Sequence, residues 1–153
     1  AEYLAPEIVL SKGHDKAVDY WALGVLIYEM EAGFSPFTDR QSQDQTLIFK
    51  NIVNGKIYPF PKKFHPLCQD LVKQLLKVDV GKRLGNLKGG PDDILAHYWC
   101  IEDKQALYNK SHRPPWIPRF RNVLDTRYFQ AEEEPFPNKD RVIDCSSWDH
   151  EFG

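Results

Sequence analysis

The sequence is poor in cysteine, and it has no long apolar segment and no large excess of charge of either sign. Its three cysteines, Cys68, Cys100 and Cys145, are too widely spaced for a metal-binding pattern or a disulfide framework, so we expect reduced thiols in an intracellular protein. The longest apolar run, residues 20–28, is about half as long as a membrane helix requires. A formal net charge of −2 argues against nucleic acid or anionic lipid as a bulk partner.

Methionine is also scarce. The only one is Met30, and neither an initiator methionine nor a signal peptide opens the chain, which begins abruptly at Ala1. This start favours a fragment of a longer chain, and a processed mature protein is the alternative. With no secretion signal and no membrane segment, we expect a cytoplasmic location.

What the sequence does contain is the composition of one globular domain followed by a tail. Hydrophobic residues make up 42% and charged residues 27% of its 153 residues. Helical patterns stop near residue 112, and 5 of the 11 prolines lie in residues 113–153. We therefore expect residues 113–153 to be extended and to need a body to lie against.

Four helices are predicted before residue 112. They cover about residues 15–32 (ending at Gly33), 44–54, 66–78 and 91–97, and the last ends between residues 97 and 99. The first is apolar on all sides, so it should be buried. The apolar faces of the second and third are predicted to be Leu47, Ile48, Ile52 and Val53, and Leu67, Leu71, Leu75 and Val78.

Two carboxylates in the first predicted helix are unusual. If Asp19 is buried in this apolar helix, it must be paired or hydrogen-bonded, because a buried lone carboxylate is costly. The alternative is an exposed Asp19 in the first turn, where the helix dipole favours an anion. Glu29 either belongs to a polar stripe or presents an anion to a cationic ligand, and both readings stay open.

An ordered set of motifs resembles the C-terminal half of a protein kinase. Ala5-Pro6-Glu7 resembles the end of a kinase activation segment. Residues 19–24 resemble the Asp-x-Trp-x-x-Gly start of the central C-lobe helix, and Pro36-Phe37 resembles the pair that follows it. Further along the chain, Arg83-Leu84-Gly85 resembles a turn that is typical of AGC kinases. It is followed by His97-Tyr98-Trp99 and Pro115-x-x-Pro118. The resemblance implies a mainly α fold, with the lower half of a kinase C-lobe over residues 1–112 and an extended AGC-type C-terminal tail over residues 113–153.

Within the AGC group, the chain resembles the cyclic-nucleotide-dependent kinases. Residues 2–4 and 24–30 are similar to both branches, and the helix is nearer to the cAMP-dependent enzyme. Residues 148–152, Trp-Asp-His-Glu-Phe, are similar to the Trp-Asp-x-Asp-Phe end of cGMP-dependent kinases. We favour cGMP on this ground, and the sequence fixes neither the nucleotide nor the physiological substrate.

The resemblance implies a supporting role for four residues. Glu7 is expected to form a bidentate ion pair with Arg83. Asp19 is expected to accept hydrogen bonds from the backbone of the catalytic loop, and Trp21 to support the same region. Because the helix that covers this region in kinases is absent, a face with Trp21, Leu23 or Val25 should be open.

The resemblance also implies contacts with substrate and nucleotide. Glu29 would face a substrate arginine two residues before the phosphorylated residue, and Glu2 a more distant basic residue. Tyr3 and Leu4 would lie under the residue just after the phosphorylation site. In the tail, Phe129 aligns with an aromatic that borders the adenine pocket. The acidic run at residues 132–134 either joins that region or is a solvated segment.

The residues that would transfer phosphate are missing. The sequence has no Gly-x-Gly-x-x-Gly, His-Arg-Asp or Asp-Phe-Gly motif, so no catalytic residue and no metal ligand is expected here. The resemblance implies that ATP and Mg²⁺ act in a full-length Ser/Thr kinase, and that this chain alone is inactive. Its expected partners are basic substrates, the N-lobe and upstream C-lobe, and a cyclic-nucleotide-binding domain or subunit. The alternative is a truncated, non-catalytic module that binds basic peptides or regulatory subunits.

Overall fold

The described part of the chain is helical. The computed structural model describes residues 1–38, 44–100 and 103–129. In order, the elements are α1 (Pro6–Val9), α2 (Ala17–Ala32), α3 (Gln45–Val53), α4 (Pro66–Leu75), a 3₁₀ turn (Val80–Lys82), α5 (Pro91–Leu95) and α6 (Lys104–Tyr108). Among these residues there is no strand, which confirms the mainly α prediction. None of the described helices is long and apolar enough to cross a membrane.

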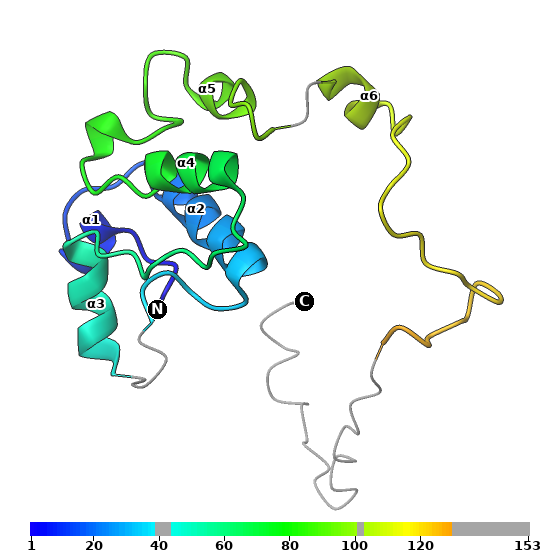
Figure 1. Cartoon of the computed structure of the whole chain (residues 1–153), viewed down its shortest axis with the longest axis horizontal. Helices are drawn as coiled ribbons and strands as arrows, with labels where there is room; N and C mark the ends of the chain where they lie inside the picture. The colour runs from blue at the N-terminus through cyan, green and yellow to red at the C-terminus, as the bar shows by residue number, and fades with distance from the viewer. Residues whose placement is uncertain (39–43, 101–102, 130–153) are drawn as a thin grey trace, which may run out of the picture. The chain divides into compact units, whose positions relative to one another are not determined.

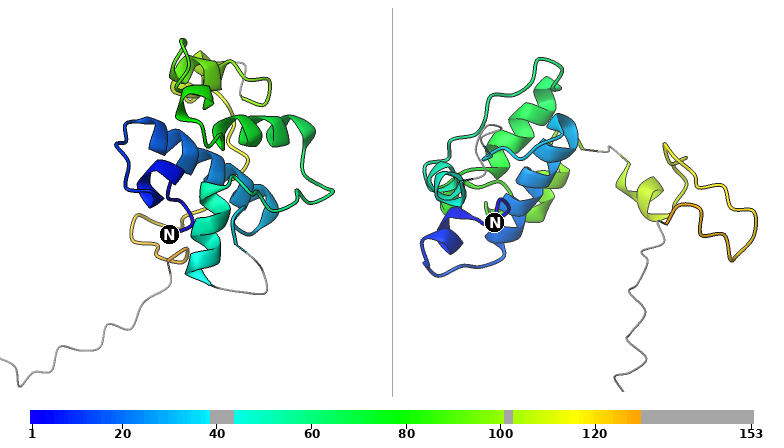
Figure 2. Two further views of the ribbon diagram at one scale, coloured as in Figure 1. Left: turned by 90° about the vertical axis from the view of Figure 1, so that its left-hand side faces the viewer. Right: turned by 90° about the horizontal axis from the view of Figure 1, so that it is seen from below.

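The chain separates into two units, Ala1–His112 and Arg113–Gly153, and each is described by itself. The centre of the first unit is α2, which packs along α4 (Figure 1). The two views of Figure 2 show the same pairing. Gly24 allows the close approach, since a Cβ there would lie 2.9 Å from both Leu75 Cβ and Leu76 Cδ2. As predicted, α2 ends at Gly33, which has a left-handed φ of 83°.

Helix α4 is shorter than predicted, because it ends at Leu75 and not near Val78. The Gln74 carbonyl accepts the Leu84 N–H (3.1 Å), so the helix gives way to a turn back toward the core. Consequently Val78 is 37% exposed, and Leu67 at the other end is 40% exposed. The predicted Leu71 and Leu75 are buried, and Cys68 and Val72 complete the buried face.

The prediction that α2 is buried on all sides is also wrong. Leu26 and Met30 are 42% and 67% exposed, so one face of the helix is open. Trp21 and Val25, which we expected on an open face, are fully buried, while Leu23 is partly buried. Trp21 is covered from within the unit, because Phe37 stacks on its indole with ring centroids 5.3 Å apart.

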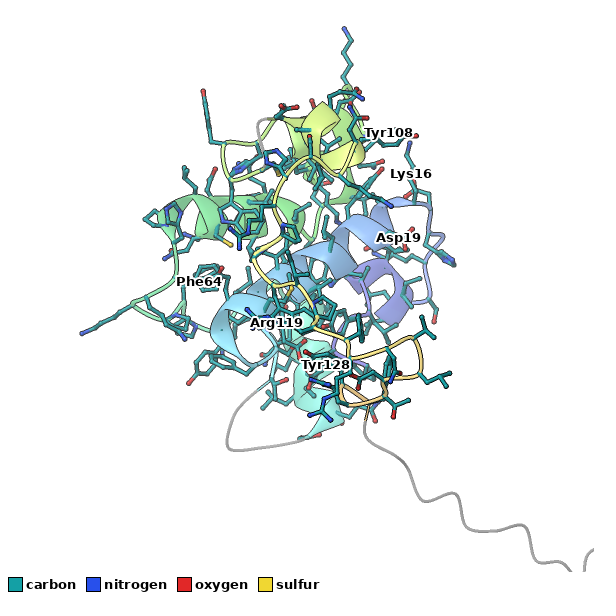
Figure 3. The ribbon with its side chains drawn as sticks, turned by 90° about the vertical axis from the view of Figure 1, so that its right-hand side faces the viewer. Lys16, Asp19, Phe64, Tyr108, Arg119 and Tyr128 are labelled. Atoms are coloured by element: carbon teal, nitrogen blue, oxygen red, sulfur yellow. The ribbon has the colours of Figure 1, made fainter. Side chains whose placement is uncertain are left out.

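The described tail, residues 113–129, has no regular element and contains one tight loop. The Tyr128 hydroxyl accepts the Arg119 N–H (3.1 Å) and donates to the Arg119 carbonyl (3.3 Å), and Figure 3 labels both residues. The Tyr128 ring meets Trp116 and Phe120 edge to face. The acidic run at 132–134, Cys145 and the motif at 148–152 lie outside the described residues.

Candidate functional site

A buried ion pair joins two segments of the first unit that are far apart in the sequence. Glu7 lies in α1, where Pro6 suits the first helical position, and Arg83 follows the 3₁₀ turn. Arg83 Nη1 donates to Glu7 Oε1 (2.7 Å) and Nη2 donates to Oε2 (3.0 Å), which is the bidentate pairing that the resemblance implied. The residues are 6% and 0% exposed, so the pair lies in the core.

Arg83 connects more than these two residues. Its Nη1 also donates to the Ala17 carbonyl at the start of α2 (2.9 Å), and its Nε donates to the Lys77 carbonyl just after α4 (3.0 Å). The guanidinium lies over the Trp21 ring, 5.2 Å from its centroid, as in a cation–π contact. One side chain therefore holds α1, α2 and the end of α4 together.

The ionisation of Glu7 reflects this pairing. Burial raises the pKa of the Glu7 carboxyl, while hydrogen bonds from Arg83 and the backbone and the charge of Arg83 lower it. The lowering contributions win, so the pKa lies below the ordinary value. We take the ionised pair as the state of the folded protein at neutral pH.

Two other carboxylates are held by hydroxyl groups. The Thr38 hydroxyl donates to Glu2 Oε1 (2.6 Å), and the Tyr3 hydroxyl donates to Glu29 Oε2 (2.5 Å). Glu2 and Tyr3 come from the start of the chain and Glu29 comes from α2, so these bonds fasten the first residues to the core. Tyr3 and Leu4 are 40% and 38% exposed beside them.

These two carboxylates have no cationic partner in the part of the chain that the structure describes. The bond to Glu29, followed by burial and then by the charges of Glu29 and Glu2, raises the pKa of Tyr3 to about 12. Both carboxylates therefore act on one hydroxyl and lie close to it. Hydroxyl donors orient a carboxylate without supplying a cation, so the positions of these two side chains are fixed by neutral partners.

Asp19 is exposed in the first turn of α2. The hypothesis of a buried, partnered carboxylate is therefore wrong for this chain, and the alternative of an exposed carboxylate at the helix start is confirmed. Figure 3 shows Asp19 and Lys16 at this end of the helix. Within residues 1–38, 44–100 and 103–129, no group is hydrogen-bonded to the Asp19 carboxylate. The positive end of the α2 dipole is the feature that favours an anion here.

Sequence reasoning missed a polar link between α4 and the segment after α5. His97 Nε2 lies 3.1 Å from Asp70 Oδ2, and His97 Nδ1 accepts the Trp99 N–H (3.2 Å). The neutral tautomer with hydrogen on Nε2 satisfies both bonds. The bonds from His97 and then from Gln74 lower the pKa of Asp70. The sequence showed the His97 motif, but not the partner on α4.

The described residues do not form a metal centre, since no group of three or more His, Cys, Asp or Glu among them could hold an ion. Phe129, the residue aligned with an adenine-bordering aromatic, lies in the tail and is 75% exposed. The geometry therefore brings together Glu2, Tyr3, Leu4 and Glu29, and separately Glu7, Arg83 and Trp21.

Comparisons with known proteins show the family of the chain. The protein kinase domain family matches residues 1–100. The chain is 45% identical over 140 residues to the cAMP-dependent protein kinase catalytic subunit 3 of Drosophila melanogaster, covering 91% of the chain and 23% of that protein. It is 42% identical over 150 residues to the human cAMP-dependent protein kinase catalytic subunit PRKX, covering 93% of the chain and 41% of that protein. It is 38% identical over 153 residues to the Drosophila cGMP-dependent protein kinase, isozyme 1, covering 99% of the chain and 19% of that protein. The chain thus spans less than half the length of these relatives.

Proposed function

The chain belongs to the protein kinase family, and we propose that it is the lower half of a kinase C-lobe with its AGC-type tail. In this proposal, the parent protein transfers the γ-phosphate of ATP to Ser or Thr in basic sequences and responds to a cyclic nucleotide. This chain supplies docking and structural residues. A cytoplasmic location belongs to the same proposal.

The observation that carries the proposal is the pair of carboxylates Glu2 and Glu29, which are oriented by hydroxyl donors and have no cationic partner among the described residues. An arginine-rich substrate needs anions at fixed positions, and a helix holds Glu29 more rigidly than a loop could. Glu29 would bind the arginine two residues before the phosphorylated residue, and Glu2 a more distant basic residue. Tyr3 and Leu4, exposed beside them, would line the floor under the residue just after the phosphorylation site.

The buried pair supports this docking surface. Residues 2–4 lead directly into α1, and Glu7 in α1 is held by Arg83 against α2, which carries Glu29. A shift of α1 would therefore move the docking carboxylates relative to each other. Asp19 would meet backbone N–H groups of the catalytic loop, and the exposed Leu26 and Met30 would meet an upstream helix of the parent.

In the proposal, the residues of this chain hold neither the phosphates of ATP nor Mg²⁺. The sequence has no phosphate-binding glycine motif, and the described residues contain no metal-binding group. Other parts of the parent would hold ATP and Mg²⁺. Of the residues in this chain, Phe129 would border the adenine. Both nucleotides occur in the names of the matched relatives, so the preference for cGMP rests on the motif at residues 148–152.

The test is phosphorylation of peptides by the protein purified at the full length encoded by its gene. One peptide has an arginine two residues before its serine, and a second has the isosteric, neutral citrulline there. Glu29→Gln should raise KM for the arginine peptide by about 10- to 100-fold, since it removes a charge-assisted bond. Glu31→Gln, on the same helix, is the matched control and should leave KM unchanged.

Equal KM values for both peptides with the unmodified protein would refute the docking role of Glu29. Tight, arginine-dependent binding without phosphate transfer would instead favour the second candidate, a non-catalytic module for basic peptides. The same two carboxylates support that candidate, so the transfer assay and a binding measurement are made on one preparation.

A further inference from the structure

Thr38 has a hydroxyl group whose position is fixed by the core. The residue before it, Phe37, is 1% exposed and stacks on Trp21. The Phe37 carbonyl accepts a hydrogen bond from Asn51 Nδ2 on α3 (3.1 Å). The backbone that leads into Thr38 is therefore held by contacts on two sides. Its β-branched side chain adds stiffness about χ1.

This hydroxyl makes a short bond to a carboxylate. Thr38 Oγ1 donates to Glu2 Oε1 at 2.6 Å, a distance typical of a bond to an ionised acceptor. Glu2 has several rotatable bonds, and a ligand that bound it without this contact would have to order it first. The bond uses Oε1, and among the described residues no group donates to Oε2.

We infer that Thr38 is a positioning residue: its hydroxyl orders the Glu2 carboxylate so that Oε2 receives a basic side chain of the ligand. The inference rests on the proposed function, because it assigns Glu2 a cationic partner. It parallels the bond from Tyr3 to Glu29, so each docking carboxylate has its own hydroxyl donor. Thr38 thus sets the preference for a second basic residue, distant from the one at Glu29.

A purely structural role of Thr38 would have a different effect on peptide affinity. If its bond only fastened the start of the chain, its loss would weaken all peptides equally through Tyr3, Leu4 and Glu29. If Thr38 positions Glu2, its loss affects only those peptides whose distal basic residue binds Glu2. The difference is measured as a ratio of affinities, which a general loss of binding leaves unchanged.

The experiment is a double-mutant cycle on the full-length protein encoded by its gene. The probes are serine peptides with one proximal arginine, two residues before the serine, and a second arginine moved stepwise upstream. In each, the distal arginine is also replaced by citrulline, and Kd is measured by fluorescence anisotropy. The protein variants are Thr38→Val, Thr38→Ser, Glu2→Gln and the double variant that combines Thr38→Val with Glu2→Gln. Thr46→Val, an exposed threonine on α3, is the control.

For at least one distal position, we expect the unmodified protein to prefer arginine over citrulline by about 10-fold or more. Thr38→Val should reduce this preference about 3- to 10-fold, because one hydrogen bond to a charged group is lost. Thr38→Ser keeps the hydroxyl and should retain most of the preference, and Thr46→Val should retain all of it. Glu2→Gln should remove it, and the effects of Thr38→Val and Glu2→Gln should not add.

An undiminished preference in Thr38→Val, or an equal loss for both peptides of a pair, overturns the inference while Glu2 keeps its docking role. If the unmodified protein shows no distal preference, the proposed role of Glu2 fails and the inference fails with it. If circular dichroism shows Thr38→Val to be unfolded, folded Thr38→Ser decides: a retained preference supports the inference, and a lost one overturns it.

Discussion

Glu2 and Glu7 lie in the same short segment and have opposite surroundings. Glu7 is 6% exposed, and both its oxygens are bound by one guanidinium. Glu2 is less buried, one of its oxygens is bound by a hydroxyl, and no cation of the described residues pairs with it. Glu29 on α2 is held by Tyr3 in the same manner as Glu2.

Under the proposed function, the difference lets one residue type serve two purposes. A neutralised carboxylate with a filled coordination sphere stabilises the fold and has nothing left to offer a ligand. A carboxylate that is oriented but not neutralised lowers the stability of the fold through its charge. The same charge strengthens the binding of a cationic ligand. Substitutions should therefore separate the two kinds: those around Glu7 should change unfolding, and those around Glu2 and Glu29 should change binding.

The largest effect should come from the buried pair. Arg83→Ala leaves Glu7 buried without its partner, and removing one side of a buried pair costs roughly 3–5 kcal/mol. Arg83→Lys should also be destabilising, because an ammonium cannot form the two-point contact or reach both the Ala17 and Lys77 carbonyls at once. Both are measured as free energies of unfolding in urea.

Lys82→Ala is the matched control for Arg83. Lys82 is the adjacent cation, its side chain is 77% exposed, and its ion pair with Asp79 is on the surface. Such pairs contribute about 0–1 kcal/mol. If Arg83→Ala costs no more than Lys82→Ala, the buried pair is not a stabilising feature and the contrast with Glu2 disappears.

The next effect concerns the side of α2 that faces α4. Gly24→Ala would place a Cβ 2.9 Å from Leu75 Cβ, and overpacking of this kind costs about 1–3 kcal/mol. Alanine is otherwise the better helix former, so a destabilising result would isolate the packing effect. Gly13→Ala is the control, because a Cβ there meets nothing within 4 Å. Equal thermal midpoints for the two variants would contradict close α2–α4 packing.

Local signals in the sequence predicted the helices well where the chain itself ends or starts them. Gly33 ends α2 in a left-handed conformation, Asp44 caps α3 through the Thr46 N–H, and Pro66 opens α4. These residues act on their immediate neighbours, so periodicity and capping chemistry are sufficient. The Glu7–Arg83 pair was also predictable, but only from the resemblance, because no local pattern relates two residues so far apart.

Tertiary contacts decided what the sequence left open or suggested wrongly. The end of α4 depends on Leu84 and Arg83, which capture the Gln74 and Lys77 carbonyls from another segment. The burial of Trp21 depends on Phe37, which folds back over it after α2. No sequence pattern singles out Thr38, a loop residue, and only the structure shows that its hydroxyl is bonded to Glu2. The open face of α2 cannot be inferred from a helix that is apolar all round.

A smaller effect should appear on acidification. The folded-state pKa of Glu7 lies below its ordinary value of 4.5, so its contribution to stability is present above that value and is lost as the pH falls through the lowered pKa. Unfolding free energies measured between about pH 7 and pH 3 should fall more steeply in the unmodified protein than in Glu7→Gln. Asp70, Asp79 and Asp125, whose pKa values are also lowered, are common to both proteins and cancel in the difference. Parallel curves would show that Glu7 does not titrate as a paired acid.

The smallest effect tests the other side of the comparison, the hydroxyl that holds Glu29. Tyr3 has a pKa raised to about 12, so its hydrogen bond to Glu29 is intact below the ordinary value of 10.0 and is lost as the pH rises through about 12. Ultraviolet titration of tyrosinate should therefore contain a late contribution near pH 12 that Tyr3→Phe removes. Glu29→Gln should move that step toward 10, because both the acceptor charge and its repulsion of the tyrosinate are gone.

Tyr98→Phe is the control for this titration, since Tyr98 is 90% exposed and its loss should leave the late step in place. The change in unfolding free energy should be slight in every variant, because Tyr3 is 40% exposed and solvent screens the interaction. That combination, a displaced titration with little change in stability, is what distinguishes an oriented carboxylate from a neutralised one. If Glu29→Gln left the late step unchanged, Tyr3 would not be held by Glu29. If it lowered stability as much as Arg83→Ala, Glu29 would belong with Glu7, and the division between the two kinds of carboxylate would be wrong.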